Sequence, residues 1–336
     1  MYAFTAKKPG TVREITDIGI IVDYDDGSTE GYTLGRRFGN AQGLTVAHTL
    51  VTELKVGDKL VIGDAIVYNN SFFEPDFFDS RHVVWKNSLN VKTVLWESAQ
   101  TLEDSSVISR RISNQLTSMV TKVKTVVITF DQAVSQLVKV GDSVIGDSVL
   151  CIIEDAVTAN NQLFDSRSIE TLKSISAQTP RAHVKGVVER VEVFYHGDTQ
   201  DMSDSLMALV RDTDKELKRQ AVATAKPVMT GSVDGGFRID GNPLSLDTLA
   251  LKIYITSEVG AGVGDKGVFA NQLKTCFGEV LEQELKTESG EVVDAIFGYK
   301  SIEARIVESP AVIGTTSTLL GLIGKRAAEI YRGTRT

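Results

Sequence analysis

The chain has 336 residues, of which 42% are hydrophobic and 24% are charged. This balance is typical of a globular protein with a sizeable core, and it excludes a largely disordered or fibrous chain. With 36 Lys and Arg residues against 44 Asp and Glu residues, the formal net charge is -8. Because the phosphate backbone rewards summed positive charge, we expect any contact with nucleic acid to be local or shared with a partner.

The two cysteines and the lengths of the apolar runs indicate the expected cellular compartment. Cys151 and Cys276 cannot build a disulfide framework or a thiolate metal site, so we expect both to be core residues in a reducing compartment. The sequence has no run of 18 apolar residues, and its start lacks the apolar core of a secretory signal. These features predict a cytoplasmic protein without membrane contact. The four histidines have no metal-ligand spacing, so a zinc site is not expected.

The first half of the chain has the pattern of β-structure. Residues 19–24 are rich in Ile and Val and are followed by Asp25-Asp26-Gly27, which is typical of a hairpin turn. Further strands are expected at 60–62, 91–96, 123–130, 149–153 and 187–194. Two similar segments, 56–64 and 140–147, are interpreted as Gly-Asp turns that lead into buried strands.

Two later segments have helical spacing. Apolar residues behind the capping candidates Asp201 and Ser203 predict a helix near 202–220 that packs on a sheet. A second helix is expected at roughly 316–332, and we interpret its broad apolar surface as core packing, with contact to a partner helix as the alternative. Between them, the polar and Gly-rich residues 221–247 predict an exposed loop or a β excursion.

Two short segments carry side chains suited to binding a divalent cation or a phosphate. Glu103 and Asp104 are adjacent carboxylates that precede Arg110 and Arg111, a combination that suits a divalent cation and a phosphate. The alternatives are a solvated turn and arginines that pair with nearby carboxylates. Lys266 lies in a Gly-Asp-Lys-Gly sequence, where the backbone can approach a ligand closely and the ammonium group can reach a phosphate or ribose oxygen.

Taken in order, these segments resemble the β subunit of multisubunit DNA-directed RNA polymerases. Residues 96–111 are similar to a signature run of that family, and Glu103-Asp104-Ser105 is the sharpest match. Residues 264–268 resemble the glycine-asparagine-lysine-glycine-valine motif, and Arg305 lies where the family has serine-arginine-methionine. Residues 32–43 are similar to a tyrosine-x-leucine-x-lysine stretch that leads into serine-asparagine-glutamine, with Gln42 retained.

The resemblance also has departures. The family has two active-site lysines about eight residues apart, and in this contracted segment only Lys266 is matched, in a position closest to the second of the two. The asparagine-proline-leucine-glycine turn of the family is lost at 298–301. The N-terminal half of a β subunit and its C-terminal clamp-anchoring segment have no counterpart, so the chain resembles one piece of a split β subunit, as in large bacteriophages.

The resemblance implies a fold and a set of partners. The expected fold is mainly β with some helix (α+β), with a double-psi β-barrel core formed by 1–118 and 248–336 and a flap-like insertion at 119–247. The implied function is a subunit of a DNA-dependent RNA polymerase that supplies the β-side half of the nucleotidyl-transfer site. It would be active only with a β′-like chain, whose aspartate triad holds the primary Mg²⁺, and with the remaining β fragments. DNA template, RNA transcript and nucleoside triphosphates would be its other partners.

The same resemblance assigns roles to individual residues. Asp104, with Glu103, would orient ligands of a second, nucleotide-borne Mg²⁺, and Lys266 would lie near the RNA 3′ end and the α-phosphate. Arg305 would contact the triphosphate, and Gln42 would make a nucleic-acid or structural contact. The alternative function is a β-rich structural or assembly protein, such as a virion component or an inactive polymerase-like remnant. The expected location is the cytoplasm, which is that of the host for a viral protein, or the virion.

Overall fold

The computed structural model describes residues 3–41, 43–76, 79–86, 88–155, 178–304 and 308–333. Strands make up 43% of the structure and helices 18%, which confirms the expectation of a mainly β protein with some helix. None of the sheets within these described ranges closes into a barrel, so the double-psi β-barrel stays a prediction.

The chain divides into two compact units. The first unit combines Met1–Lys86 with Met119–Ser257, and the second combines Asn87–Ser118 with Glu258–Thr336. This division groups residues 1–86 with 119–257, and the barrel core expected at 1–118 and 248–336 stays a prediction. The two candidate segments at 103–104 and 264–268 both belong to the second unit.

The first unit begins with a four-stranded antiparallel sheet of order β4-β3-β2-β7. Its strands are β2 (Gly10–Ile15), β3 (Gly19–Tyr24), β4 (Thr29–Thr33) and β7 (Lys59–Leu60). The predicted hairpin joins β3 to β4, and Gly27 at its turn has a φ of 83°, a conformation that glycine adopts without strain. The side chains of Ile20 and Val22 on β3 are fully buried in one apolar cluster with Ile66, and they fix which face of the sheet meets the core.

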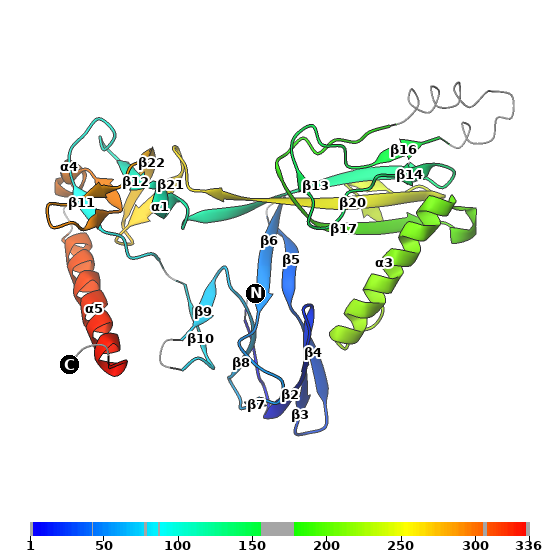
Figure 1. Cartoon of the computed structure of the whole chain (residues 1–336), viewed down its shortest axis with the longest axis horizontal. Helices are drawn as coiled ribbons and strands as arrows, with labels where there is room; N and C mark the ends of the chain where they lie inside the picture. Colours follow the sequence, from blue (N-terminus) through cyan, green and yellow to red (C-terminus); the bar gives the residue numbers. More distant parts are fainter. Residues whose placement is uncertain are drawn as a thin grey trace. The chain divides into compact units, whose positions relative to one another are not determined.

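A larger sheet follows in the first unit, with the order β1-β8-β6-β13-β20-β17-β15 and with β5 paired to β6 (Figure 1). Its strands are β1 (Ala3–Thr5), β5 (Gly35–Ala41), β6 (Leu44–Val51), β8 (Ala65–Asn69), β13 (Thr117–Thr129), β15 (Ser143–Val144), β17 (Gly186–His196) and β20 (Thr248–Gly260). Helix α3 (Asp204–Ala223) confirms the helix predicted near 202–220. Its buried Leu206 and Val210 belong to the same apolar cluster as Ile253 and Ile255 of β20, so the predicted packing on a sheet is also confirmed.

The two similar segments form the predicted turns. A backbone N–H three residues earlier donates to the carboxylate of Asp58 (2.7 Å) in one turn and of Asp142 (2.8 Å) in the other. The preceding glycines, Gly57 and Gly141, have φ values of 91° and 99°. Each turn leads into a strand of two residues, β7 or β15, in which one residue is buried and one exposed, so the turns are confirmed and the expected buried strands are formed only in part.

Smaller hairpins complete the first unit. They pair β9 (Phe73–Pro75) with β10 (Val83–Trp85), β14 (Ala133–Ser135) with β16 (Ile152–Glu154), and β18 (Arg238–Ile239) with β19 (Asn242–Pro243). The hairpin of β18 and β19 is the β excursion predicted within 221–247. A short 3-10 helix, η2 (Thr199–Asp201), precedes α3.

The second unit is built on a mixed five-stranded sheet of order β11-β25-β12-β22-β21. Its elements are β11 (Thr93–Leu95), β12 (Ser105–Ser109), α1 (Arg110–Ser113), β21 (Lys266–Phe269), β22 (Leu273–Leu281), β23 (Leu285–Lys286), β24 (Val292–Val293), β25 (Ala295–Phe297) and α4 (Tyr299–Glu303). Strand β12 runs parallel to β22 and antiparallel to β25. A small core of Ile108, Ile112, Phe277 and Ala295 holds these elements together.

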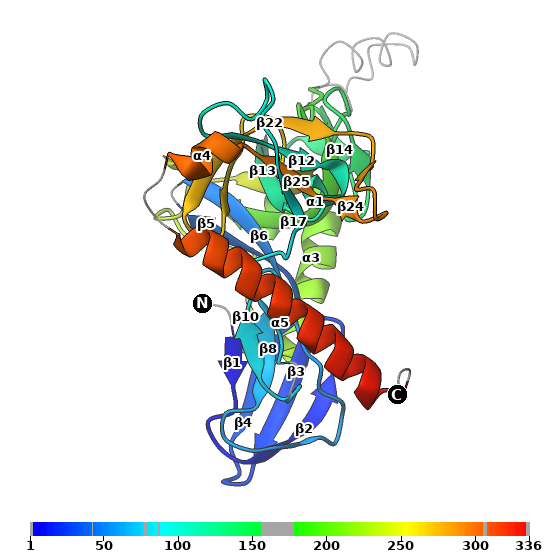
Figure 2. The same cartoon turned by 90° about the vertical axis from the view of Figure 1, so that its left-hand side faces the viewer.

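Helix α5 (Ser309–Tyr331) corrects the expectation for the C-terminal helix. It begins earlier than predicted, and only Pro310 is buried among its described residues. Leu320 and Ile323 are both 62% exposed, so the expected core packing is wrong. The small core of this unit is filled by the sheet and α1, and Figure 2 shows α5 extending away from that sheet. Within the part of the chain that the structure describes, no helix is long and apolar enough to cross a membrane.

The two cysteines differ in exposure. Cys151 is fully buried, as expected for a core thiol. Cys276 is exposed, which corrects the expectation that both would lie in the core. The reason is the alternation of β22, in which Thr275 and Phe277 are buried and Cys276 between them faces solvent.

Candidate functional site

The acidic pair lies in a turn that ends at the start of β12. The backbone of Glu103 has a φ of 55°, and its carbonyl oxygen accepts a hydrogen bond from the Ser301 hydroxyl. The carbonyl oxygen of Asp104 accepts a hydrogen bond from the backbone N–H of Cys276 at 2.9 Å. Backbone bonds therefore anchor this turn to its neighbours, while both carboxylate side chains are exposed.

Strand β22 joins this turn to the predicted lysine. Cys276 is the register partner of Ser105 in the parallel pair of β12 and β22. Cys276 is also the register partner of Lys266 in the antiparallel pair of β21 and β22. Because neighbouring strands lie about 4.8 Å apart, the backbones of Ser105 and Lys266 are separated by about 10 Å. The structure thus brings together the acidic turn and the lysine, which are far apart in the sequence.

The side chains of Lys266 and Ser105 lie on the same face of this sheet. Register partners point to the same side, so Lys266 projects on the face that carries Cys276. The hydroxyl of Ser105 lies on this face too, because a Cβ added at Gly278 would clash with it. The lysine ammonium and the end of the acidic turn can therefore face one ligand bound over this part of the sheet.

The glycines around Lys266 have structural roles. Gly264 forms the turn before β21 with a φ of 92°, and the carboxylate of Asp265 accepts a hydrogen bond from the N–H of Gly262 at 2.8 Å. A Cβ at Gly267 would lie 2.5 Å from the ring of Phe277, so only glycine fits against that buried ring. The turn and this close approach hold Lys266 at the start of β21 with its side chain exposed.

The two arginines after the acidic pair have carboxylate partners elsewhere. Both nitrogens of one side of the Arg110 guanidinium bond to the carboxylate of Glu282, with the Nε contact at 3.1 Å. Arg111 bonds to the carboxylate of Asp294, which is buried. The alternative in which these arginines pair with nearby carboxylates is therefore confirmed, because Arg110 and Arg111 bind carboxylates other than Glu103 and Asp104.

The sequence analysis missed one lysine on the same face. Lys274 of β22 is exposed and is the register partner of Val268, which makes it a diagonal cross-strand neighbour of Lys266. Diagonal neighbours have side chains within about 7–8 Å of each other, within reach of long side chains. The alternation of buried and exposed residues along β22 places Lys274 on this face, and the sequence alone has no signal that pairs it with Lys266.

Two predicted site residues, Gln42 and Arg305, lie outside the described residues. Within the described ranges, no group of three His, Cys, Asp or Glu side chains is placed to hold a metal ion. The exposed carboxylates of Glu103 and Asp104 are compatible with the indirect role expected for them, in which water bridges them to a metal ion that arrives with a nucleotide.

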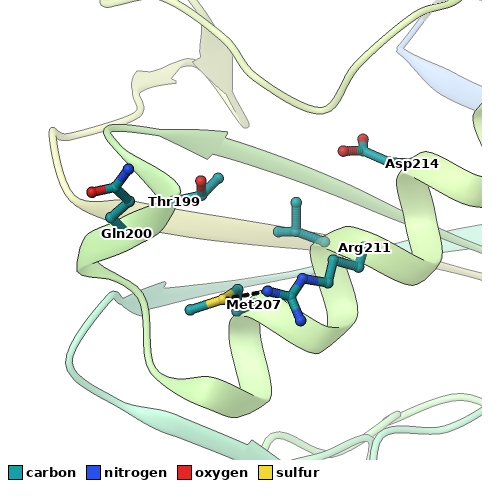
Figure 3. Close-up of a pocket in the computed structure, with 6 residues that line it drawn as sticks. Thr199, Gln200, Met207, Arg211 and Asp214 are labelled. Atoms are coloured by element: carbon teal, nitrogen blue, oxygen red, sulfur yellow. Dashed lines mark hydrogen bonds between the residues drawn. The ribbon is translucent and has the colours of Figure 1, made fainter.

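A pocket of about 260 Å³ lies in the first unit, between η2 and α3 (Figure 3). It is lined by Thr199, Gln200, Met207, Val210, Arg211 and Asp214. Figure 3 shows the Arg211 guanidinium directed to the Met207 sulfur, at 3.1 Å. None of the residues that line this pocket was predicted from the sequence as a site residue.

Comparison with known proteins gave no assignment. No protein-family model and no curated protein matches the chain. Its function is therefore argued from its residues and from the geometry of the second unit.

Proposed function

We propose that this chain is a subunit of a DNA-dependent RNA polymerase and supplies the β-side half of the site for nucleotidyl transfer. The observation that carries the proposal is the position of Cys276, which is paired with Ser105 on one side and with Lys266 on the other. It joins the two segments whose resemblance to polymerase motifs is sharpest. A double-psi barrel core at 1–118 and 248–336, with a flap-like insertion at 119–247, is part of this proposal.

The exposed lysine is suited to electrostatic catalysis. In the proposed reaction, the RNA 3′ hydroxyl attacks the α-phosphate of a nucleotide and pyrophosphate leaves. The ammonium of Lys266 would stabilise the negative charge that develops on the phosphate, and Lys274 would add a second positive charge on the same face of the sheet. Removal of one such contact typically costs about 2.7–4 kcal/mol of transition-state stabilisation, or about 100- to 1,000-fold in rate.

The carboxylates would act on the metal side of the same nucleotide. Bound Mg²⁺ offsets phosphate charge and orients the reacting oxygens, and a partner chain with an aspartate triad would hold the primary ion. Asp104, assisted by Glu103, would accept hydrogen bonds from water around the nucleotide-borne ion. Arg305 would bind the triphosphate through its planar fork, and Gln42 would contact nucleic acid or support the structure.

The proposal is tested in the complex isolated from the native source. We expect the largest companion chain to contain an aspartate triad, and we expect Asp104→Ala in the assembled complex to slow RNA elongation by about 100- to 1,000-fold. Lys266→Ala should have an effect of similar size. Glu288→Ala is a matched control, because Glu288 is an exposed carboxylate in a different turn of the same unit.

The amount of variant chain that enters the complex distinguishes a loss of catalysis from a loss of assembly. The Asp104→Ala chain should enter the complex in the same amount as the unchanged chain, because its backbone bond to Cys276 does not use the carboxylate. Elongation at the normal rate with Asp104→Ala would contradict the proposed role. Together with the absence of polymerase chains from the complex, it would favour a structural or assembly protein.

A further inference from the structure

Helix α3 carries a carboxylate on the side that packs on the sheet. Leu206 and Val210 are buried in the apolar cluster of the first unit, and Asp214 follows Val210 by one helical turn, so it lies along the same face of the helix. Burial raises the pKa of Tyr195 on β17, and the negative charge of Asp214 raises it further, which places Asp214 close to that strand. A carboxylate in such a position is normally paired with a cation.

The carboxylate of Asp214 has no cationic partner within the described ranges. Its Oδ1 atom is shielded from solvent without a hydrogen bond, and no described Lys, Arg or His side chain lies within ion-pair distance of it. Asp214 also lines the pocket between η2 and α3. A ligand that brings a positive charge and N–H donors into this pocket would therefore supply the partner that the carboxylate lacks.

An arginine without a described carboxylate partner lines the same pocket. Arg211 precedes Asp214 by three residues, and its guanidinium is directed to the Met207 sulfur at 3.1 Å rather than to Asp214 (Figure 3). Sulfur is a weak acceptor, so the donors of Arg211 remain available for a stronger one. No described carboxylate lies within ion-pair distance of this arginine. The pocket thus presents one negative and one positive group, and neither has a counterion among the described residues.

The other residues of the pocket limit the size and the polarity of a ligand. Met207 and Val210 of α3 provide an apolar wall, and Thr199 and Gln200 of η2 add a hydroxyl and an amide group. The volume of about 260 Å³ lies below the range of about 300–1,000 Å³ that is typical of sites for drug-sized ligands. The ligand is therefore a small molecule with charged and apolar parts.

We propose that this pocket binds a free α-amino acid. The ammonium group would bind to the carboxylate of Asp214, the carboxylate would bind to the planar fork of Arg211, and an apolar side chain would contact Met207. An α-amino acid carries both charges on one carbon atom, which suits two groups that lie three residues apart on one helix. A chain terminus of another protein carries only one of the two charges. Because a zwitterion has no net charge, the net charge of -8 does not oppose its binding.

The test uses the full chain and a panel of free L-amino acids, with binding measured by calorimetry and by the rise in unfolding temperature. We expect at least one amino acid with an apolar side chain to bind. The amine and the carboxylic acid that correspond to this ligand are then compared with it; for L-leucine they are isoamylamine and isocaproate. Each should bind at least about 10-fold more weakly, because each lacks one charge-assisted contact.

Two substitutions and two matched controls assign the contacts. Asp214→Asn and Arg211→Gln should each weaken binding by about 10- to 100-fold, the value of a charge-assisted hydrogen bond. Asp212→Asn and Lys215→Gln remove an exposed charge of each sign from the same helix, outside the pocket. These two controls should change binding by less than about twofold, because exposed charges at a distance are screened.

Unfolding without ligand distinguishes a loss of binding from a loss of folding. Asp214→Asn should unfold at the same or a higher temperature, because it removes a charge whose Oδ1 atom is shielded and unpaired. If it unfolds earlier, Arg211→Gln provides the test, because Arg211 is exposed and forms no ion pair with a described residue. The proposal is overturned if no amino acid binds with a Kd below about 10 mM, or if the amine alone binds as tightly as the amino acid. It is also overturned if the two controls weaken binding as much as the two pocket variants.

Discussion

Disulfide trapping tests the register that places the acidic turn beside the lysine. Ser105 and Lys266 are both register partners of Cys276, so a cysteine at either position should form a disulfide with it under mild oxidation. Neighbouring strands lie about 4.8 Å apart, within the Cα separation of about 4.4–6.8 Å that a disulfide requires. Cys151 is fully buried, so Cys276 is the thiol available to the new cysteine.

The two disulfides should stabilise the fold to different extents. The bond from Ser105→Cys to Cys276 spans 171 residues, and a loop of this length corresponds to about 5 kcal/mol of lost entropy in the unfolded chain. The bond from Lys266→Cys closes a loop of about ten residues and should contribute about 3 kcal/mol. Both values are upper limits, because strain in the native state reduces the gain in the free energy of unfolding. Chemical unfolding with and without reductant measures the difference, and mass spectrometry of peptides identifies the bond.

A control on the same face completes the experiment. Val268 is exposed on β21 but is paired with Lys274 rather than with Cys276, so Val268→Cys should give little disulfide under the same conditions. The proposed register is refuted if Ser105→Cys stays reduced while Val268→Cys reacts. Failure of both Ser105→Cys and Lys266→Cys in a folded chain would remove the geometric basis of the proposed site.

Three further predictions concern the stability and reactivity of the chain. Asp294→Ala should lower the free energy of unfolding by about 3 kcal/mol, because the buried carboxylate accepts bonds from Arg111 and a backbone N–H, and Asp294→Asn should cost less. Ala270→Gly should raise the free energy of unfolding by about 1 kcal/mol, because residue 270 has a φ of 46° in the tight turn between β21 and β22. Chemical denaturation measures the change for the Asp294 and Ala270 variants, and an unchanged free energy of unfolding would contradict the reasoning. At pH 8, a thiol reagent should label Cys276 quickly in the native chain and Cys151 only after unfolding, because burial raises the pKa of Cys151 to about 11; rapid reaction of two thiols would refute this.

Much of the local structure followed from periodicity and turn chemistry. The hairpin at Asp25-Asp26-Gly27, the helix near 202–220 and the paired Gly-Asp turns are each determined by residues close in the sequence. The C-terminal helix was predicted as a helix but wrongly placed in the core. Helical periodicity shows that a segment has an apolar face, and it contains no information on whether another element covers that face.

For the candidate site, too, the sequence identifies individual residues but not which of them lie close together. Glu103, Asp104 and Lys266 were selected from the sequence, but their proximity depends on pairing between strands that are far apart along the chain. Lys274 was missed for this reason, because only the hairpin of β21 and β22 shows that it shares a face with Lys266. The ion pair between Arg111 and the buried carboxylate of Asp294 likewise joins residues that only the fold brings together.

The register of β22 decides which side chains reach the candidate site, and two glycines restrict that register. A side chain at Gly267 would displace the buried ring of Phe277, and one at Gly278 would clash with the hydroxyl of Ser105 and approach the carbonyl oxygen of Gln100 to 3.0 Å. A shift of one residue along β22 would reverse the direction of its side chains, placing Lys274 and Cys276 in the core and Phe277 in solvent. Burial of Phe277 therefore opposes such a shift, and the same packing that stabilises this small core keeps both lysines on the exposed face beside the acidic turn.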